Sequence, residues 1–414
     1  MSTLAIHGGS PAINYQLPDW NDITGRDIGE EEKKLVLEVL DSGRLGMVCG
    51  VKVKELQKMW AEKCGVDTAV AVSNGTASLH TALIYACIGA GDEVLVPCIT
   101  DMGTVIAILL QNGVPVFVDV DPVTQNMDLA DFERKITKRS KAVIPVHMFG
   151  LPCEIEEIVD VAHRHGLIVV EDCCQAHFAT YKGKYVGTIG DIGCFSFQQT
   201  KHITAGEGGM VITNGDKKYS RELQLCGDKG WPRNKYREHY FLAPNYHMTD
   251  LQAAVAIPQL ARIEKNLEAR RVSGETLTNC LNEIDGVLTA KVSKEKTHTY
   301  FAYQFAIDPD KFTTDRDTLV KAIKAEGLDI IPSYLPKPLY RYDFLQKTVM
   351  YNSTGCPLKC GYYEGKADYT KVNCPKAEYA CKVGMFMQWN EKLTAEHSKD
   401  MGNAIKKVLE YYHI

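Results

Sequence analysis

Four polar side chains that could act together in catalysis lie close together in the sequence. Asp172 follows an apolar strand candidate, and Gln175 lies three residues further on. Ser196 falls inside the next apolar strand candidate, and Lys201 follows that strand. A glycine-rich turn at 205–209 comes next and would let the backbone bend tightly around a ligand. A carboxylate, an amine and a hydroxyl so arranged suit proton transfer and covalent capture of a carbonyl.

An anionic pyridine aldehyde would use every member of this set. The carboxylate of Asp172 would keep a pyridine nitrogen protonated, which turns the ring into an electron sink. The amine of Lys201 would bind the aldehyde and then move a proton on the substrate carbon. Asn74-Gly75-Thr76 follows another strand and opens a helix. The N–H groups and the positive end of that helix could hold a phosphate.

Each residue also has an ordinary structural interpretation. An aspartate at a strand end often caps a helix, a lysine there is often solvated, and Gly-Thr before a helix is common capping chemistry. Composition and spacing alone therefore leave both interpretations open.

The elements around these residues predict an α/β fold with a mainly parallel sheet. Val- and Ile-rich strands alternate with helices, and in such a sheet the ligand lies at the carboxyl ends of the strands. The polar residues named above all follow strands, so they should meet at one edge. The expected strands are 69–73, 93–97, 114–120, 141–146, 167–172, 194–197 and 209–213, and the expected helices are 29–42, 53–64, 76–88, 103–111 and 154–165.

The rest of the chain predicts a second, smaller lobe. A long helical pattern from 248 to about 285 leads into it, followed by further strands and helices and a final helix at 394–412. Residues 340–381 have weak periodicity and are interpreted as an excursion on this smaller lobe. We expect a large domain at 1–265 and a small domain at 266–414.

Charge and composition exclude several classes of partner. With 414 residues, a net charge of −5 and 45% hydrophobic residues, the chain is typical of soluble globular proteins, and nothing favours nucleic acid or membrane as partner. It has no apolar run long enough to span a bilayer and no signal-peptide pattern, and its 14 cysteines are scattered. A cytoplasmic protein with reduced cysteines is expected. Cys356, Cys360, Cys374 and Cys381 lack the tight spacing of a zinc site, so no metal is predicted.

The chain closely resembles the DegT/DnrJ/EryC1/StrS family of sugar aminotransferases, which are fold-type I pyridoxal phosphate (PLP) enzymes. The resemblance covers nearly the whole sequence. It is carried by IHGGSPA at the start, SNGTASLHTAL at 73–83, EDCCQAH at 171–177, GDIGCFSFQQTKHITAGEGGM at 190–210 and NYHMTDLQAAV at 245–255.

The resemblance implies a role for each residue of the cluster. Asp172 would pair with the pyridine nitrogen of PLP, Gln175 with the ring hydroxyl, and Lys201 would hold the cofactor as a Schiff base. Asn245 resembles the asparagine that reaches the phosphate in the neighbouring subunit, so a homodimer with a shared active site is implied. His147 and His177 fall in family motifs, either as structural or as catalytic residues. The phosphate would be held by Gly75, Thr76 and Ser196.

Two departures from the family pattern bear on the substrate. The family places an aromatic residue over the pyridine ring where this chain has Asp101, so either Met102 covers the ring or its face is polar. The family's Asn-Tyr-Arg is Asn245-Tyr246-His247 here, which would weaken the binding of an anion or make it pH-dependent. Lys201 itself is present, with His202 merely following it, which favours transamination over the dehydration catalysed by relatives that carry histidine in place of the lysine.

The resulting prediction is a PLP-dependent aminotransferase of secondary metabolism. It would move an amino group from glutamate or glutamine to a keto sugar, possibly nucleotide-linked, or to a cyclitol ketone. Two alternatives remain: a PLP-dependent dehydratase or lyase that uses Asp101 as an acid or base, and a non-catalytic PLP-binding regulatory protein. The sequence leaves the ketone, the donor and the effect of Asp101 open.

Overall fold

The structure, a computed structural model, describes residues 3–215, 222–233, 237–351, 354–359, 361–365 and 367–414. Its larger sheet has seven strands in the order β1-β9-β8-β5-β4-β2-β3. β2, β3, β4, β5 and β8 form the parallel pairs, whereas β9 runs antiparallel to both β1 and β8. The strands are β1 Thr68–Val72, β2 Glu93–Pro97, β3 Val114–Val118, β4 Ser140–Val143, β5 Ile168–Asp172, β8 Ile192–Ser196 and β9 Gly209–Thr213. The prediction of an α/β fold with a mainly parallel sheet is confirmed.

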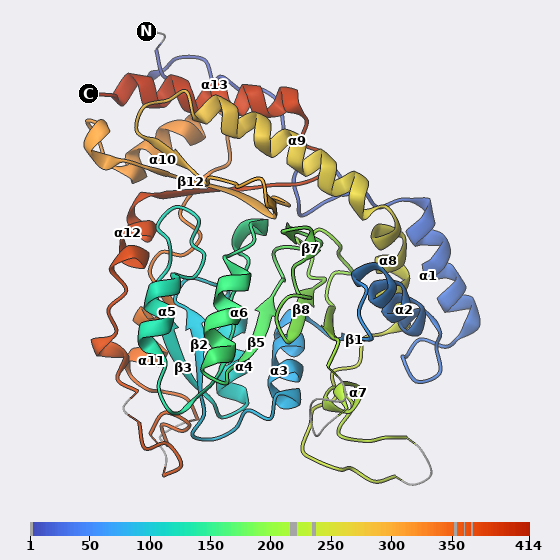
Figure 1. Ribbon diagram of the computed structural model, residues 1–414. Helices are drawn as coiled ribbons and strands as arrows, with labels where there is room; N and C mark the ends of the chain where they lie inside the picture. The colour runs from blue at the N-terminus through green and yellow to red at the C-terminus, as the bar shows by residue number, and fades with distance from the viewer. Residues whose placement is uncertain (1–2, 216–221, 234–236, 352–353, 360, 366) are drawn as a thin grey trace.

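Helices cover both faces of this sheet because successive strand residues point to opposite sides. Val94 and Val96 pack with helices α3 and α4, whereas Leu95 between them packs with α6 on the other face. Figure 1 shows this layering, with the smaller sheet beyond one end of the larger one. The helices of this part are α1 Glu30–Ser42, α2 Lys52–Cys64, α3 Gly75–Tyr85, α4 Met102–Leu110, α5 Leu129–Lys135, α6 Ile155–Arg164 and the short α7 Leu223–Cys226.

The expected long helix at 248–285 is two helices. α8 Asp250–Ala261 begins at a capping box, in which Thr249 and Gln252 bond reciprocally, and α9 Ile263–Leu281 follows. Arg262 between them leaves helical geometry at φ −105° and ψ 11°, and its side chain pairs with Asp27, Glu31 and Glu32. These ion pairs fix the change of direction toward the smaller sheet.

The smaller sheet lies under α9 and the last helix. Its four strands run in the order β10-β12-β14-β13, and α13 packs along α9. Its strands are β10 Val287–Thr289, β12 Ala302–Ile307, β13 Ile331–Pro332 and β14 Gly384–Gln388, and the helices of this part are α10 Arg316–Ala325, α12 Pro375–Val383 and α13 Ala395–Tyr412. A separate three-stranded sheet is formed by β6 Thr180–Tyr181, β7 Lys184–Tyr185 and β11 Lys296–Thr297. The helix α11 Asp343–Gln346 is a single turn.

The placement of residues 340–381 on the smaller lobe is wrong for much of this stretch. Tyr340, Leu345 and Tyr369 belong to the hydrophobic core of the larger sheet. Tyr369 also donates a hydrogen bond from its hydroxyl to the Pro115 carbonyl at 2.8 Å. The sequence did not predict this packing, because these aromatic residues recur with neither helical nor strand spacing. The division at residue 265 stays a prediction.

The first residues of the chain belong to the smaller sheet's core. Leu4 and Ile13 are buried there together with Leu409 of α13. The carboxylate of Glu326 fixes this segment by accepting the N–H groups of Ala5 and Ala12 at 2.8 and 2.9 Å. Within the described residues, no helix is long and apolar enough to cross a membrane.

Candidate active site

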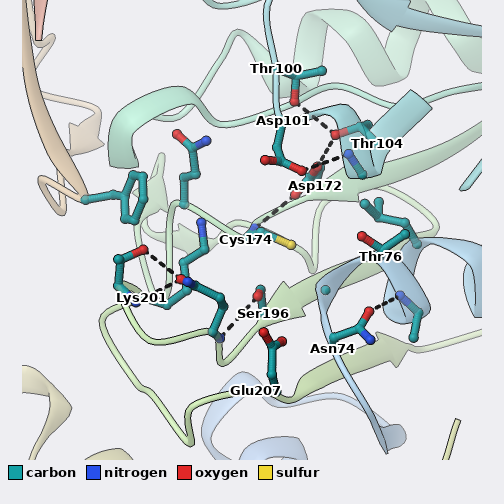
Figure 2. A pocket seen from close by; sticks show the side chains of 18 of the residues that line it. Asn74, Thr76, Thr100, Asp101, Thr104, Asp172, Cys174, Ser196, Lys201 and Glu207 are labelled. Carbon is teal, nitrogen blue, oxygen red and sulfur yellow. Dashed lines mark hydrogen bonds between the residues drawn. The ribbon is translucent and has the colours of Figure 1, made fainter. Parts of the chain in front are cut away.

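A cavity of about 740 Å³ opens where the predicted cluster meets the smaller sheet. Six of the predicted residues line it, contributed by the ends of β1, β5 and β8 and the loop after β8: Gly75, Thr76, Asp172, Gln175, Ser196 and Lys201. Figure 2 shows several of their side chains facing the same space. The expected convergence at the carboxyl edge of the sheet is therefore seen.

Helix α3 brings its N-terminus to one end of the cavity. Asn74 caps the helix by accepting the Ala77 N–H at 2.8 Å, which leaves earlier N–H groups of the first turn free to bind an anion. A methyl group on Gly75 would lie 2.7 Å from the Ser196 Cβ. Glycine is thus needed for the buried Ser196 hydroxyl to lie against the helix start. This cradle fits a phosphate group.

Asp172 is held rigidly at the other end. Its Oδ2 accepts the Thr104 hydroxyl at 3.0 Å and its Oδ1 accepts the Cys174 N–H at 3.1 Å. The residue is 4% exposed and has no ion-pair partner within the described part of the chain. A buried carboxylate oriented in this way suits a cationic ring nitrogen. Thr104, which the sequence did not single out, comes from the first turn of α4.

Gln175 lies between the two sheets. Its Oε1 accepts the Phe149 N–H at 2.9 Å and its Nε2 donates to the Tyr334 hydroxyl at 3.4 Å. Burial raises the pKa of Tyr334, and the charges of Asp101 and Asp172 raise it further, so Tyr334 presents a protonated hydroxyl to the cavity. Nothing near Tyr334 in the sequence marked it, because it follows the strand Ile331–Pro332, more than a hundred residues after the motif.

The side chain of Lys201 lines the cavity on the side of Phe301. Its ammonium lies 4.0 Å from the centroid of the Phe301 ring. Burial lowers the pKa of Lys201 from 10.5, although the negative charges of Asp101 and Asp172 partly oppose this effect. A lowered pKa increases the fraction of free amine, the form that attacks a carbonyl and accepts a proton.

Arg26 fixes the loop that carries Lys201. The guanidinium, 2% exposed, donates to the carbonyls of Lys201 and Gln199 at 2.7 and 2.5 Å, and to that of Trp20 at 2.9 Å. It also lies 3.8 Å from the carboxylate of Glu391, just after β14. Arg26 stands before the first helix, where a single arginine gives no distinguishing pattern, so the sequence did not reveal this function.

One predicted cofactor contact, Met102, takes another position, and the role predicted for Asn245 in a neighbouring subunit stays a prediction. Met102 does not line the cavity; its side chain packs against the core of the larger sheet, whereas Asp101 faces the cavity. The reason is that Asp101 caps α4 in an extended conformation and Met102 begins the helix, so their side chains diverge. Asn245 is exposed and does not line the cavity of its own chain.

The histidines of the motifs lie outside the cavity lining. His147 is buried, and its Nε2 bonds to the Glu171 carboxylate at 3.0 Å. His177 is buried among aromatic rings, including Trp60, and burial lowers its pKa to about 3. His247 bonds through its Nε2 to the Asp228 carboxylate at 2.8 Å. All three positions favour structural roles.

Of the four C-terminal cysteines considered for metal, Cys360 lies outside the described residues. Cys374 is buried beside Cys98 and Asp119. Asp119 already accepts the N–H groups of Lys376 and Ala377 at the start of α12. This bonding assigns Asp119 a helix-capping function.

Comparison with known proteins agrees with the resemblance. Residues 26–359 match the model of the DegT/DnrJ/EryC1/StrS aminotransferase family. The GDP-perosamine synthase of Caulobacter vibrioides is 38% identical over 306 residues, which is 74% of this chain and 82% of that protein. A Streptoalloteichus tenebrarius protein named as an L-glutamine:3-amino-2,3-dideoxy-scyllo-inosose aminotransferase is 34% identical and covers 82% of both chains. The crystal structure of 3-amino-5-hydroxybenzoic acid synthase superposes with a TM-score of 0.83 at 25% identity, over 96% of this chain and 100% of that one.

Proposed function

This chain belongs to the DegT/DnrJ/EryC1/StrS aminotransferase family, and we propose that it transfers the amino group of glutamate or glutamine to a ketone on a sugar or cyclitol ring. It is a PLP-dependent enzyme. The observation that carries the proposal is that Lys201, the buried carboxylate of Asp172 and the anion-binding start of α3 all line one cavity. These three features match the aldehyde, ring nitrogen and phosphate of PLP.

Each of the residues that line the cofactor site would have a defined task in this reaction. Bound PLP withdraws electrons from the substrate carbon attached to the transferred nitrogen. Asp172 would keep the ring nitrogen protonated, and Gln175 would contact the ring hydroxyl. Gly75, Thr76 and Ser196 would hold the phosphate. The free amine of Lys201 would take the proton from the donor's α-carbon and return it to the carbon that was the acceptor ketone.

The acceptors of relatives span two kinds of ring. The C. vibrioides protein is named as a GDP-perosamine synthase, and the S. tenebrarius protein as an L-glutamine:3-amino-2,3-dideoxy-scyllo-inosose aminotransferase. This range supports a cyclic ketone as acceptor.

We further propose a cytoplasmic homodimer in secondary metabolism. The exposed position of Asn245 supports the dimer, since this residue is free to reach the phosphate site of a partner. Cys98, Cys153, Cys173 and Cys194 are buried as thiols, which supports a reducing compartment.

The test is a spectral titration of the purified protein with PLP, with Lys201→Ala as the variant. Wild type should acquire visible absorption on binding PLP and lose it when glutamate or glutamine is added, with release of the keto acid. Lys201→Ala should bind PLP without that absorption and release no keto acid. Lys406→Ala, at a lysine of α13 that pairs with Glu283 and does not line the cavity, is the matched control and should behave as wild type. Absence of keto acid release by the wild type with any amino acid donor would refute the transaminase assignment.

A further inference from the structure

A groove separate from the catalytic cavity lies between the parts of the chain built on the larger and the smaller sheet. It has a volume of about 1180 Å³ and is bounded on one side by the loop after β3, at residues 121–124. Its other sides are α9, β10 and the segment that leads from β10 to Tyr300. Among the described residues, none lines both this groove and the catalytic cavity. A ligand of the groove would therefore be neither the cofactor nor the acceptor.

His298 presents an unpartnered N–H group to the groove. The residue is 8% exposed, and its ring stacks on that of Tyr300 with the centroids 3.8 Å apart and the planes within 4°. Its Nδ1 accepts the Tyr300 N–H at 2.9 Å. Burial lowers the pKa of His298 to about 3, so the ring is neutral and its one proton lies on Nε2. No acceptor for this proton is found in the part of the chain that the structure describes. Because a buried donor without an acceptor is costly, the position favours a ligand that supplies one.

The charges of the groove lining favour an anion. Both carboxylates of the described lining already have partners: Glu275 pairs with Arg271 at 3.0 Å, and Asp121 accepts N–H groups of its own turn. Lys291 and Lys294 also line the groove, and neither forms an ion pair with a described residue. Two ammonium groups and a neutral N–H donor thus remain for a ligand. This set suits an oxygen acceptor that carries negative charge.

The segment that carries His298 continues into the catalytic cavity. Tyr300 has a left-handed φ of 46°, a conformation that few residues other than glycine adopt. The chain turns there, so that His298 and Tyr300 line the groove whereas Phe301 lines the catalytic cavity. The ring of Phe301 lies 4.0 Å from the ammonium of Lys201. A contact that holds His298 in place would therefore act on the position of Phe301 beside Lys201.

We propose that the groove binds a small oxyanion, a phosphate or a carboxylate group, through the Nε2–H of His298 and the ammonium groups of Lys291 and Lys294. The bound anion holds His298 against Tyr300 and so restrains the segment that places Phe301 beside Lys201. The groove is thus a regulatory site. It does not depend on which ketone the enzyme aminates.

The test is calorimetry on the holoenzyme, in which PLP fills the phosphate cradle at the start of α3. Inorganic phosphate and citrate are titrated separately, which distinguishes a phosphate site from a carboxylate site. His298→Asn keeps an acceptor for the Tyr300 N–H, because asparagine Oδ1 takes the place of Nδ1, but it removes the Nε2–H. Affinity for the anion that binds should fall about ten- to a hundredfold, the range for a lost hydrogen bond to a charged group.

A double variant of exposed lysines guards against misfolding of the histidine variant. Lys291→Gln with Lys294→Gln should weaken binding of the same anion about three- to tenfold, as expected for two solvent-exposed charges. Lys138→Gln with Lys141→Gln is the matched control, because these lysines are exposed, equally spaced in the sequence and outside the groove. Its affinity should equal that of the wild type. If neither anion binds the wild type, or if binding persists unchanged in the variants of His298 and of Lys291 and Lys294, the site is overturned.

Hydrogen exchange followed by mass spectrometry tests the connection to the catalytic cavity. The anion that binds should slow exchange in the peptide that contains Tyr300 and Phe301, since the Tyr300 N–H is bonded to His298 and the Phe301 N–H to the Phe149 carbonyl at 2.8 Å. This protection should be absent in His298→Asn. Binding without any change of exchange in this peptide would refute the connection.

Discussion

The guanidinium of Arg26 donates a hydrogen bond to the main-chain carbonyl of Lys201 at 2.7 Å. The residue that precedes the first helix therefore fixes the loop that carries the cavity's lysine. Because Arg26 also lies 3.8 Å from Glu391, beyond β14, it connects that loop to the smaller sheet. Its function is to position Lys201.

Arg26→Met should lower the free energy of unfolding by about 3–5 kcal/mol, because it leaves the buried Glu391 with one cation fewer and several carbonyls without a donor. The Lys201 loop should also loosen, so the apoprotein should bind PLP more weakly. Urea unfolding and PLP titration measure the two effects. Arg271→Met removes a half-exposed surface arginine paired with Glu268 and Glu275 and should cost less than about 1 kcal/mol. Equal stability of the two variants would contradict the positioning role.

Gly75→Ala should weaken phosphate binding without abolishing folding. The added Cβ would lie 2.7 Å from the Ser196 Cβ and 2.9 Å from its Oγ, so the start of α3 or the end of β8 must shift, at about 1–3 kcal/mol. PLP affinity of the apoprotein should fall about tenfold. Gly89→Ala, where a Cβ meets nothing within 4 Å, is the control. If Gly75→Ala binds PLP as wild type does, Gly75 does not belong to the phosphate cradle.

Lys201 should react with amine reagents at a lower pH than a free lysine. Its pKa lies below 10.5 because of burial, so its labelling in the apoprotein, followed by mass spectrometry, should have its midpoint below that value. The folded state then binds fewer protons than the unfolded state between the lowered pKa and 10.5. This residue's contribution to stability consequently rises with pH across that window. Asp101→Asn should move the midpoint lower still, because the charge of Asp101 raises the pKa of Lys201. A shift to higher pH would contradict the placement of the Asp101 carboxylate near Lys201.

His177 should make the protein sensitive to acid. Its pKa is lowered to about 3 by burial, against 6.5 when unfolded, so its contribution is fully present above pH 6.5 and is lost as the pH falls toward 3. The loss amounts to about 1.4 kcal/mol per pH unit within that window. In His177→Phe the free energy of unfolding, measured with urea, should therefore depend less steeply on pH between 6 and 4.5. The difference in slope should correspond to about one proton. His165→Phe, at an exposed position, should leave the slope unchanged.

The sequence predicted the larger sheet well because its signals are local. Apolar strands, capped helices and the polar residues that follow β1, β5 and β8 can all be recognised within a few neighbouring residues. The prediction erred at Met102, because which of two adjacent side chains faces a cavity depends on where a helix begins. Trp20, Arg26, Tyr334 and Phe386 reach the site from remote parts of the chain, and no local pattern links such residues. The prediction of a single helix at 248–285 was wrong for the same reason. Arg262, where the two helices meet, is held by acids more than two hundred residues away in the sequence.

The core that contains Leu4 and Ile13 also contains Leu409, so it joins the two ends of the chain. During synthesis Leu4 and Ile13 leave the ribosome long before Leu409, so they must wait for α13 before they can be buried. The larger sheet is in a similar position, because Tyr340 and Tyr369 complete its core long after β9 has been made. Neither lobe could be expressed alone by cutting the gene at one point. A fragment that keeps the core of the smaller sheet would need the segment of Leu4 and Ile13 joined to α13.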